Sequence, residues 1–237
     1  MRCETSWHAF CIFRGTGIRI VKPSKRCHRR PVILVHGFLS SPRAMGLLKS
    51  HLRRRLGREV YTVAIGWGRH DLRECADEVY AKVSELAGRR DFEYADVVGH
   101  SMGGLVAIYL LKRIDRGRLV RSVITLGTPH RGAPLARLGV LVLGRISAAV
   151  WQMLPGSDFL RELLQHPMPR QSRIVSIVAE RDWIVPGASA DAVDGAGYAT
   201  VRVGDAGHTT LLYDRSVLEL VGSSIAPDSG TAMSEAA

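Results

Sequence analysis

The sequence predicts an α/β fold: a minimal, mostly parallel sheet of about six to seven strands, with helices on both faces and a small helical cap. Short, nearly continuous apolar runs such as Val32–Val35 are typical of strands that are buried on both faces of a parallel sheet. Segments with apolar residues at helical spacing follow these runs in alternation, as crossover connections require. With 237 residues, 46% of them hydrophobic, the chain is long enough to bury one sizeable core.

Residues 1–30 form a basic N-terminal extension in which Ile18–Val21 is a candidate edge strand. The whole chain has a formal net charge of +11, and arginine supplies most of it. Such a charge favours peripheral contact with an anionic membrane surface, while a solvated basic exterior is the alternative. The sequence carries no recognisable nucleic-acid-binding motif, so nucleic acid is not expected as a partner.

The four cysteines show neither C-x-x-C nor Cys/His metal spacing, and three of them fall within the first 27 residues. We therefore expect scattered thiols in a reducing compartment rather than a disulfide framework. The sequence has neither the layout of a signal peptide nor an apolar run long enough to cross a membrane. Together these observations predict a cytoplasmic protein.

The first half of the main domain, which we expect over residues 31–222, alternates strands with helices. A strand over 31–35 leads to a helix that begins at Ser41-Pro42 and ends near Leu56, with Gly57 as the stop. A strand over 60–65 precedes an amphipathic helix over 71–87, which Gly88 is expected to close. A short strand, a tight turn and an apolar helix to about residue 113 follow.

The second half contains an insertion. Strands are predicted over 120–126, 172–179 and 198–203, a closing helix includes Val217–Val221, and residues 223–237 are expected to be a disordered tail. The segment 133–169 interrupts this alternation with runs such as Leu138–Leu143, which are more apolar than a surface helix should be. The insertion either packs into the core or forms a helical cap or lid over a site.

The stretch Gly99-His100-Ser101-Met102-Gly103 fits the pattern G-x-S-x-G. In that pattern the serine lies on a sharp strand-to-helix turn, where a Cβ at either glycine would strike its neighbours. The turn presents the Ser101 hydroxyl above the sheet, beside the N–H groups of a helix N-terminus. A strand-to-helix turn without any chemistry is the alternative interpretation.

Reactive residues follow three of the predicted strands. Functional groups gather at the carboxyl ends of parallel strands, and Ser101, Asp182 and His208 each stand at such an end. A serine hydroxyl needs a base within hydrogen-bond reach, and that base needs an acid to orient it. We predict Ser101 as nucleophile, His208 as base and Asp182 as acid, with Asp205 as the rival for the acid.

On these residues the chain resembles the α/β-hydrolase superfamily, and more narrowly the bacterial lipases and the GPI inositol-deacylase-like serine hydrolases. The matching segments cover most of the main domain: 32–38, 98–104, 125–132, 182–186 and 207–208. The resemblance implies the α/β-hydrolase fold and a catalytic triad of Ser101, Asp182 and His208. It also implies an oxyanion hole made by the backbone N–H groups of Phe38 and Met102.

The resemblance further implies a serine carboxylic-ester hydrolase, an esterase or lipase of lipid metabolism that cleaves fatty-acyl esters through an acyl-enzyme. An acyltransferase, thioesterase or amidase with the same triad is the nearest alternative. A non-catalytic protein with the hydrolase fold, docked on anionic membranes through its arginines, is the more distant one. The expected partner is accordingly an acyl-ester or lipid substrate.

Four residues outside the triad are candidates for the substrate pocket: His130, Trp151, Met153 and Leu154. For His130, an ordering role in its own loop is the alternative. His36 and His100 are predicted to pack structurally around the serine turn. No acidic residue stands between His208 and Asp214, so we expect no calcium site, no other metal and no cofactor.

Overall fold

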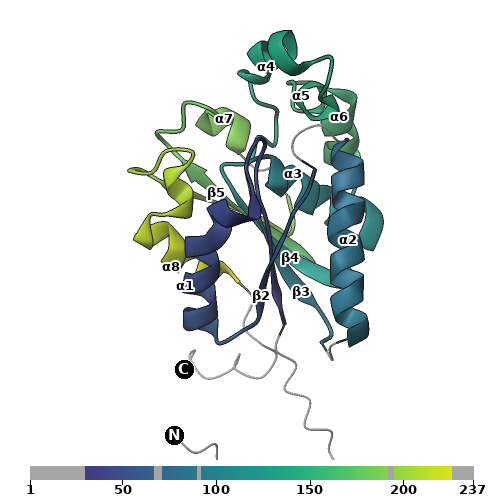
Figure 1. The fold of residues 1–237 in the computed structure, drawn as a ribbon, viewed down its shortest axis with the longest axis vertical. Coiled ribbons are helices and arrows are strands. Elements are labelled where there is room, and N and C mark those ends of the chain that lie inside the picture. The colour runs from purple at the N-terminus through teal and green to yellow at the C-terminus, as the bar shows by residue number, and fades with distance from the viewer. Residues whose placement is uncertain (1–29, 67–70, 90–91, 192–194, 226–237) are drawn as a thin grey trace, which may run out of the picture.

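A computed structural model describes residues 30–66, 71–89, 92–191 and 195–225. They fold around a six-stranded sheet in the order β2-β1-β3-β4-β5-β6, in which every neighbouring pair is parallel (Figure 1). The predicted fold class is therefore confirmed. The strands are β1 (Val32–Val35), β2 (Val60–Val63), β3 (Ala95–His100), β4 (Val120–Leu126), β5 (Arg173–Ala179) and β6 (Tyr198–Val203).

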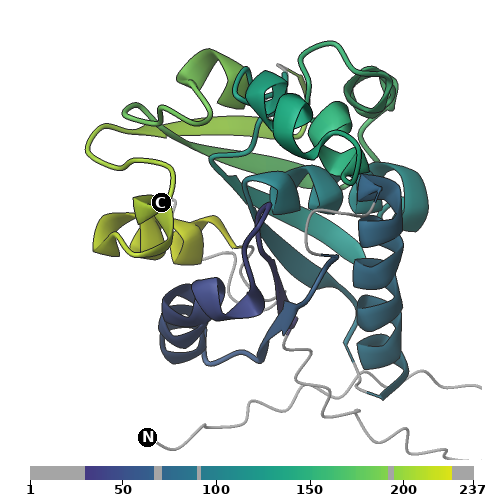
Figure 2. The same ribbon diagram turned by 45° about the horizontal axis from the view of Figure 1, so that its top comes forward.

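Helical segments connect the strands and cover the sheet. They are η1 (Pro42–Met45), α1 (Gly46–Leu56), α2 (Leu72–Arg89), α3 (Met102–Tyr109), η2 (Leu110–Asp115), α4 (Ala136–Leu143), α5 (Ala148–Gln152), α6 (Asp158–Gln165), α7 (Gly187–Ala190), η3 (Thr210–Leu212) and α8 (Arg215–Ser224). Helices α2 and α3 lie on one face, and α1 and α8 lie on the other (Figures 1 and 2). Both faces of the sheet are thus covered.

The two core clusters explain why the central strands are apolar throughout. Along β1, Ile33 and Val35 join the cluster beneath α2 and α3, whereas Val32 and Leu34 join the cluster beneath α1 and α8. Successive side chains of a strand point to opposite faces, so a strand between two helical layers has no polar side.

Helix ends follow the prediction at one glycine and differ at another. Gly57 adopts a left-handed conformation with φ of 61°, and its N–H donates to the carbonyl of Arg53 at 3.1 Å, which is a common way to end a helix. The predicted stop at Gly88 is wrong, because α2 continues to Arg89. Gly88 is not among the glycines with positive φ, so it lacks the left-handed conformation in which a glycine commonly ends a helix.

The C-terminal helix extends further than expected. α8 ends at Ser224, and the side chain of Ile225 is buried in the cluster beneath α1 and α8. The N–H of Ile225 also donates to the carbonyl of Val221 at 3.1 Å. The folded part therefore passes the expected boundary at residue 222 by three residues, since burial of one more apolar side chain continues the core.

Several predictions concern residues that the structure does not describe: the strand at Ile18–Val21, the thiols of Cys3, Cys11 and Cys27, and residues 226–237 of the tail. The remaining cysteine, Cys75, is free and buried. Burial raises the pKa of the Cys75 thiol to about 12, so it stays protonated near neutral pH. In the described part of the chain, no helix is both long and apolar enough to cross a membrane.

The insertion at 133–169 folds into three helices of different character. α5 and α6 place Val150, Phe159, Leu160 and Leu163 in the core cluster beneath α2 and α3. α4 lies at the top of Figure 1, beyond the carboxyl ends of the strands. One part of the insertion thus belongs to the core, and another stands over the edge where the predicted site residues gather.

Candidate active site

Ser101 occupies a strained position between β3 and α3. Its φ is 53° and its ψ is −124°, an uncommon conformation for a residue with a side chain. Close backbone approach explains the flanking glycines. A Cβ on Gly99 would lie 2.5 Å from the carbonyl oxygen of Gly103, and one on Gly103 would lie 2.4 Å from the carbonyl oxygen of Val35. The sequence pattern therefore marks a real steric requirement at both positions.

A third glycine is equally constrained, and sequence reasoning did not single it out. A Cβ on Gly104 would lie 1.9 Å from Oγ1 of Thr128. That hydroxyl donates to the carbonyl oxygen of Ser101 at 3.0 Å, so the loop after β4 packs directly on the serine turn. The Gly-Gly pair after Ser-Met was the signal in the sequence that could have indicated this contact.

His208 and Asp182 meet at the same edge of the sheet. Nδ1 of His208 lies 2.6 Å from Oδ2 of Asp182, and the Asp182 side chain is 1% exposed. The other carboxylate oxygen accepts hydrogen bonds from the N–H groups of Ile184 and Val185, at 2.9 and 2.7 Å. The carboxylate is thus fixed by its own loop and faces the imidazole.

His100 joins the serine turn to the His208 loop. Its Nε2 lies 3.0 Å from the carbonyl oxygen of His208, and the two imidazole rings are 4.9 Å apart between centroids. Burial lowers the pKa of His100 to about 4, assisted by the neighbouring His208, so this ring stays neutral and donates through Nε2. In the described structure the hydroxyl of Ser101 makes no hydrogen bond to His208 itself, a looseness that is common in sites without substrate.

The rival acid, Asp205, and the histidines His36 and His130 make their polar contacts with residues other than His208. Asp205 is 91% exposed and pairs with Arg181 at 3.5 Å, so it is not held against His208. His36 accepts from the N–H of Ile65 at 3.3 Å, which ties β1 to the segment after β2. His130 is buried between the hydroxyls of Thr125 and Ser176, at 3.2 and 3.1 Å.

A sequence profile of the alpha/beta hydrolase family matches residues 32–221. The chain belongs to this family. Two curated triacylglycerol lipases, from Pseudarthrobacter phenanthrenivorans and Burkholderia plantarii, are each 30% identical to it over 116 residues. The matches cover 46% of this chain but 35% and 32% of those proteins, so the similarity spans about a third of each relative.

Solved structures agree with this fold. The mature lipase BlEst2 of Bacillus licheniformis matches this α/β hydrolase with a TM-score of 0.65 and 18% identity, covering 78% of this chain and 87% of that one. Est1E of Butyrivibrio proteoclasticus matches with a TM-score of 0.55 and 20% identity, covering 85% and 87%. The hydrolase described here is therefore similar to lipases and esterases.

The predicted backbone donors, Met102 and Phe38, belong to the helix that begins after Ser101 and to the turn that follows β1. Met102 is the first residue of α3, so its N–H has no acceptor within the helix. Phe38 follows β1 in a tight turn that closes with a hydrogen bond from Ser40 to Gly37 at 3.3 Å. A Cβ on Gly37 would lie 3.1 Å from Cβ of Ser101, so this turn reaches the serine.

The four pocket candidates fall into two groups. Trp151 and Leu154 line a hollow of about 530 Å³ between the α5–α6 connection and Arg73 of α2, together with Gln152 and residues 155–159. Met153 is buried in the core, and burial lowers the pKa of His130 to about 4, as expected of a neutral ring enclosed by protein. Among the described residues that line the hollow, none is a member of the predicted triad.

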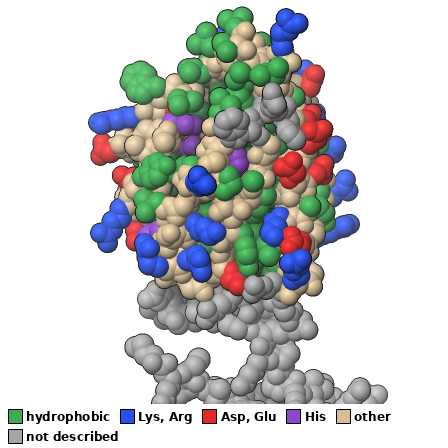
Figure 3. Space-filling model, viewed as in Figure 1, with side chains coloured by type: hydrophobic (Ala, Val, Ile, Leu, Met, Phe, Trp, Pro, Cys, Tyr) green, Lys and Arg blue, Asp and Glu red, His purple; other side chains and the backbone are tan. Residues whose placement is uncertain are grey.

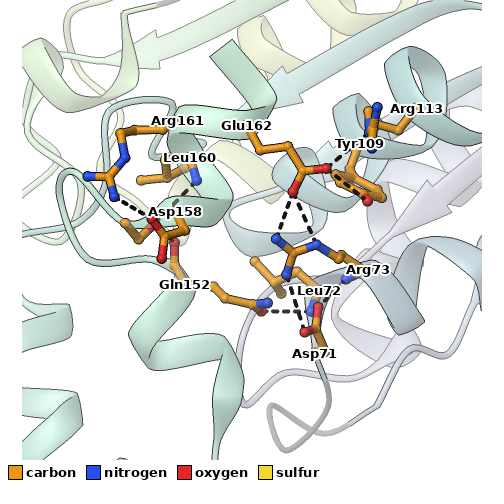
Figure 4. A network of polar contacts seen from close by, with 11 residues as sticks. Asp71, Leu72, Arg73, Tyr109, Arg113, Gln152, Asp158, Leu160, Arg161 and Glu162 are labelled. Atoms are coloured by element: carbon orange, nitrogen blue, oxygen red, sulfur yellow. Dashed lines mark hydrogen bonds and ion pairs between the residues drawn. The ribbon is translucent and has the colours of Figure 1, made fainter. Parts of the chain in front are cut away.

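A polar network fastens the inserted helix α6 to α2 (Figure 4). Nη2 and Nε of Arg73 donate to one carboxylate oxygen of Glu162, at 2.7 and 3.3 Å, and Arg113 pairs with the other at 3.0 Å. The N–H of Leu72 donates to the side chain of Gln152 at 2.8 Å. Burial opposes ionisation of Glu162, but the hydrogen bond from Arg73 and the positive charges of Arg73 and Arg113 together outweigh it and lower the pKa of this carboxyl.

Proposed function

We propose that this α/β hydrolase is a serine carboxylic-ester hydrolase that cleaves fatty-acyl esters through an acyl-enzyme. One observation carries the proposal: a buried Asp182 holds Nδ1 of His208 at 2.6 Å, and His208 is tied through His100 to the turn that carries Ser101. A merely structural histidine would not need a buried carboxylate on Nδ1 together with a tie to a strained serine turn.

In the proposed mechanism, Nε2 of His208 takes the proton of Ser101 while Oγ attacks the ester carbonyl carbon. Asp182 keeps the proton of the imidazole on Nδ1, which leaves Nε2 free as base, and then stabilises the imidazolium. The N–H groups of Phe38 and Met102 donate to the oxyanion. Collapse of the tetrahedral intermediate breaks the C–O bond, and the alcohol leaves with the proton from His208.

Water then replaces the alcohol. His208 removes a proton from the water as its oxygen attacks the acyl carbon, and the second tetrahedral intermediate expels Ser101, which recovers its proton from His208. The products are a fatty acid and an enzyme ready for another cycle. The names of the two curated relatives, both triacylglycerol lipases, support a fatty-acyl ester as the substrate class.

The proposal assigns the segment 133–169 to a cap on a hydrolase domain over 31–222, with the acyl chain received on the cap side. Support comes from hydrogen bonds between this segment and the rest of the chain. The N–H of Leu72 in α2 donates to the side chain of Gln152 at 2.8 Å, and the amine of Lys112 in η2 donates to the carbonyl of Leu163 at 2.7 Å. These bonds hold the segment against α2 and η2, while α4 lies beyond the strand ends (Figure 1).

Covalent labelling with a fluorophosphonate probe tests the nucleophile. We expect labelling of the wild type and of Ser41→Ala, whose serine makes no side-chain cap hydrogen bond, and complete loss of labelling in Ser101→Ala. A series of p-nitrophenyl esters of increasing acyl length then tests the substrate class. A folded wild type that takes no label would overturn the proposal, and a sharp preference for acetate would restrict it to small esters.

A matched pair of aspartates tests the acid. We expect Asp182→Asn to lower kcat on the order of 10³–10⁴-fold, because an amide at this position favours the wrong imidazole tautomer. Asp205→Asn, at the exposed rival, should leave kcat unchanged. An equal loss in both variants, or in neither, would contradict the role assigned to Asp182.

A further inference from the structure

The outward face of α4 is apolar, the reverse of an ordinary surface helix. Leu135, Leu138, Leu141 and Val142 are 49%, 62%, 81% and 80% exposed, and their spacing places them on one side of the helix. On the opposite side Ala136 is buried, and Val140 packs against the core cluster beneath α2 and α3. Figure 3 shows hydrophobic side chains gathered at the top of the molecule, where α4 lies in Figure 1.

A second apolar element stands at the same end of the sheet. Trp183 is 88% exposed and Ile184 is 43% exposed, in the loop that follows β5. Asp182 accepts hydrogen bonds from the N–H groups of Ile184 and Val185, so the loop that holds the proposed acid also presents the tryptophan to solvent. An exposed tryptophan on a braced loop is suited to the boundary between water and lipid.

The charges in the stretch that contains α4 have one sign. Residues 131–157 contain Arg131, Arg137 and Arg145 but no aspartate or glutamate. Arg137 and Arg145 flank the apolar face of α4, and within the described part of the chain neither side chain forms an ion pair. Apolar residues bordered by arginines are complementary to acyl chains beneath anionic headgroups.

We propose that α4 and the loop at Trp183 form a docking surface for an anionic phospholipid bilayer. We call it the docking surface; its residues are Leu135, Arg137, Leu138, Leu141, Val142, Arg145, Trp183 and Ile184. The apolar side chains enter the headgroup region, and the arginines bind lipid phosphates. The inference rests on the proposed function only in placing the lipid at the edge where Ser101 lies, and docking itself needs no catalysis.

Docking occurs without release of the cap. α6 is fastened to α2 by Glu162 and Arg73 at 2.7 Å, and the buried amine of Lys112 donates to the carbonyl of Leu163 at 2.7 Å. α4 is exposed while these bonds are in place. The docking surface is therefore already exposed while α6 is held against α2, and binding should not depend on a conformational change in α6.

Vesicle flotation tests the docking surface in the full-length Ser101→Ala variant, so that hydrolysis cannot alter the lipid. We expect flotation with vesicles of phosphatidylcholine and phosphatidylglycerol in equal parts, and none with phosphatidylcholine alone. Arg137→Gln combined with Arg145→Gln should weaken binding about 30-fold. Leu138→Gln combined with Leu141→Gln should reduce flotation to background.

Matched controls remove the same groups elsewhere. Arg53→Gln with Arg54→Gln removes two exposed arginines from α1, and Leu47→Gln with Leu164→Gln removes two exposed leucines that lie outside the docking surface. Both control pairs should float like the parent. Equal flotation with neutral and anionic vesicles, or equal loss in test and control pairs, would overturn the proposal.

Two further outcomes separate the alternatives. A concentration-dependent dimer that Leu138→Gln with Leu141→Gln dissociates, without vesicle binding, would overturn the proposal and assign the face to a second copy of the chain. Failure of the proposed function is a different result, namely absence of fluorophosphonate labelling in the wild type. Docking by Ser101→Ala would still stand in that case, since flotation reads binding alone.

Discussion

Helices α4 and α6 both lie in the segment 133–169, but they differ in which side chains they bury. α6 buries Phe159, Leu160 and Leu163 and turns its charged residues to solvent or to partners on α2. α4 buries Ala136 and exposes Leu138, Leu141 and Val142. From this difference we expect two roles within the segment 133–169: α6 contributes to the stability of the fold, and α4 contributes little to it and exposes its apolar face.

The largest effect is expected at Phe159, which is 1% exposed and stacks on Tyr109 with ring centroids 5.5 Å apart. We expect Phe159→Ala to lower the free energy of unfolding by about 3–5 kcal/mol, because truncation of a buried aromatic leaves a cavity. Urea denaturation followed by circular dichroism measures this loss. A loss below about 1 kcal/mol would mean that α6 is not part of the core.

A smaller effect is expected from Lys112, whose buried amine donates to the carbonyl of Leu163 in α6. Burial lowers the pKa of this amine from 10.5 to about 8, so the folded protein binds fewer protons than the unfolded chain between these two values. Stability contributed by Lys112 should therefore rise as pH increases from about 8 to 10.5 and be lost again as pH falls through 8.

The Lys112→Met variant isolates this contribution from other groups that titrate in the same range. We expect the free energy of unfolding of the wild type to gain about 2 kcal/mol relative to Lys112→Met between neutral and alkaline pH. Thermal melts at closely spaced pH values measure the difference. Parallel pH profiles for the two proteins would show that the amine of Lys112 is hydrated rather than enclosed against α6.

Much of this architecture follows from local sequence patterns. The apolar run at Val32–Val35 predicts a strand between two helical layers because both of its faces are filled. The G-x-S-x-G stretch predicts the serine turn because the glycines are sterically required there. The order of Ser101, Asp182 and His208 predicts a shared edge of the sheet, where the structure brings the last two within 2.6 Å.

Other features depend on contacts between distant segments, which no local pattern encodes. The contact between Gly104 and Thr128 and the ion pair between Arg73 and Glu162 join residues far apart in the chain. The apolar pattern of 138–143 also does not tell whether the apolar side of the helix faces the protein or the solvent. Hydrophobic spacing indicates that one side of a helix avoids water, but whether protein covers that side is decided by the rest of the fold.

The anchor of α6 at Glu162 should contribute modestly to stability. Its carboxylate pairs with Arg73, whose side chain is 37% exposed, so solvent screening limits the gain. We expect Glu162→Gln to lower the free energy of unfolding by about 0.5–1 kcal/mol. Because the pKa of Glu162 is lowered, this contribution is present at neutral pH and lost as pH falls through the folded-state pKa.

A salt series gives the control for that variant. The difference between Glu162→Gln and the wild type should shrink with added sodium chloride, because exposed ion pairs are screened. Glu85→Gln, on the exposed side of α2 beside Lys82 and Arg89, should change stability less, since its partners lie on the same helix. A larger effect from Glu85→Gln would contradict the expectation that the ion pair between α2 and α6 stabilises the fold more than one within α2.

The smallest effect is expected on α4. Leu141 is 81% exposed, so truncation to alanine removes almost no buried area and improves helix propensity slightly. We expect Leu141→Ala to change the free energy of unfolding by less than about 0.5 kcal/mol, in direct contrast to Phe159→Ala in α6. Urea denaturation at low protein concentration measures this, because dilution prevents copies from covering each other. A loss of more than about 2 kcal/mol would show that Leu141 is enclosed in solution, and the contrast between the two helices would then fail.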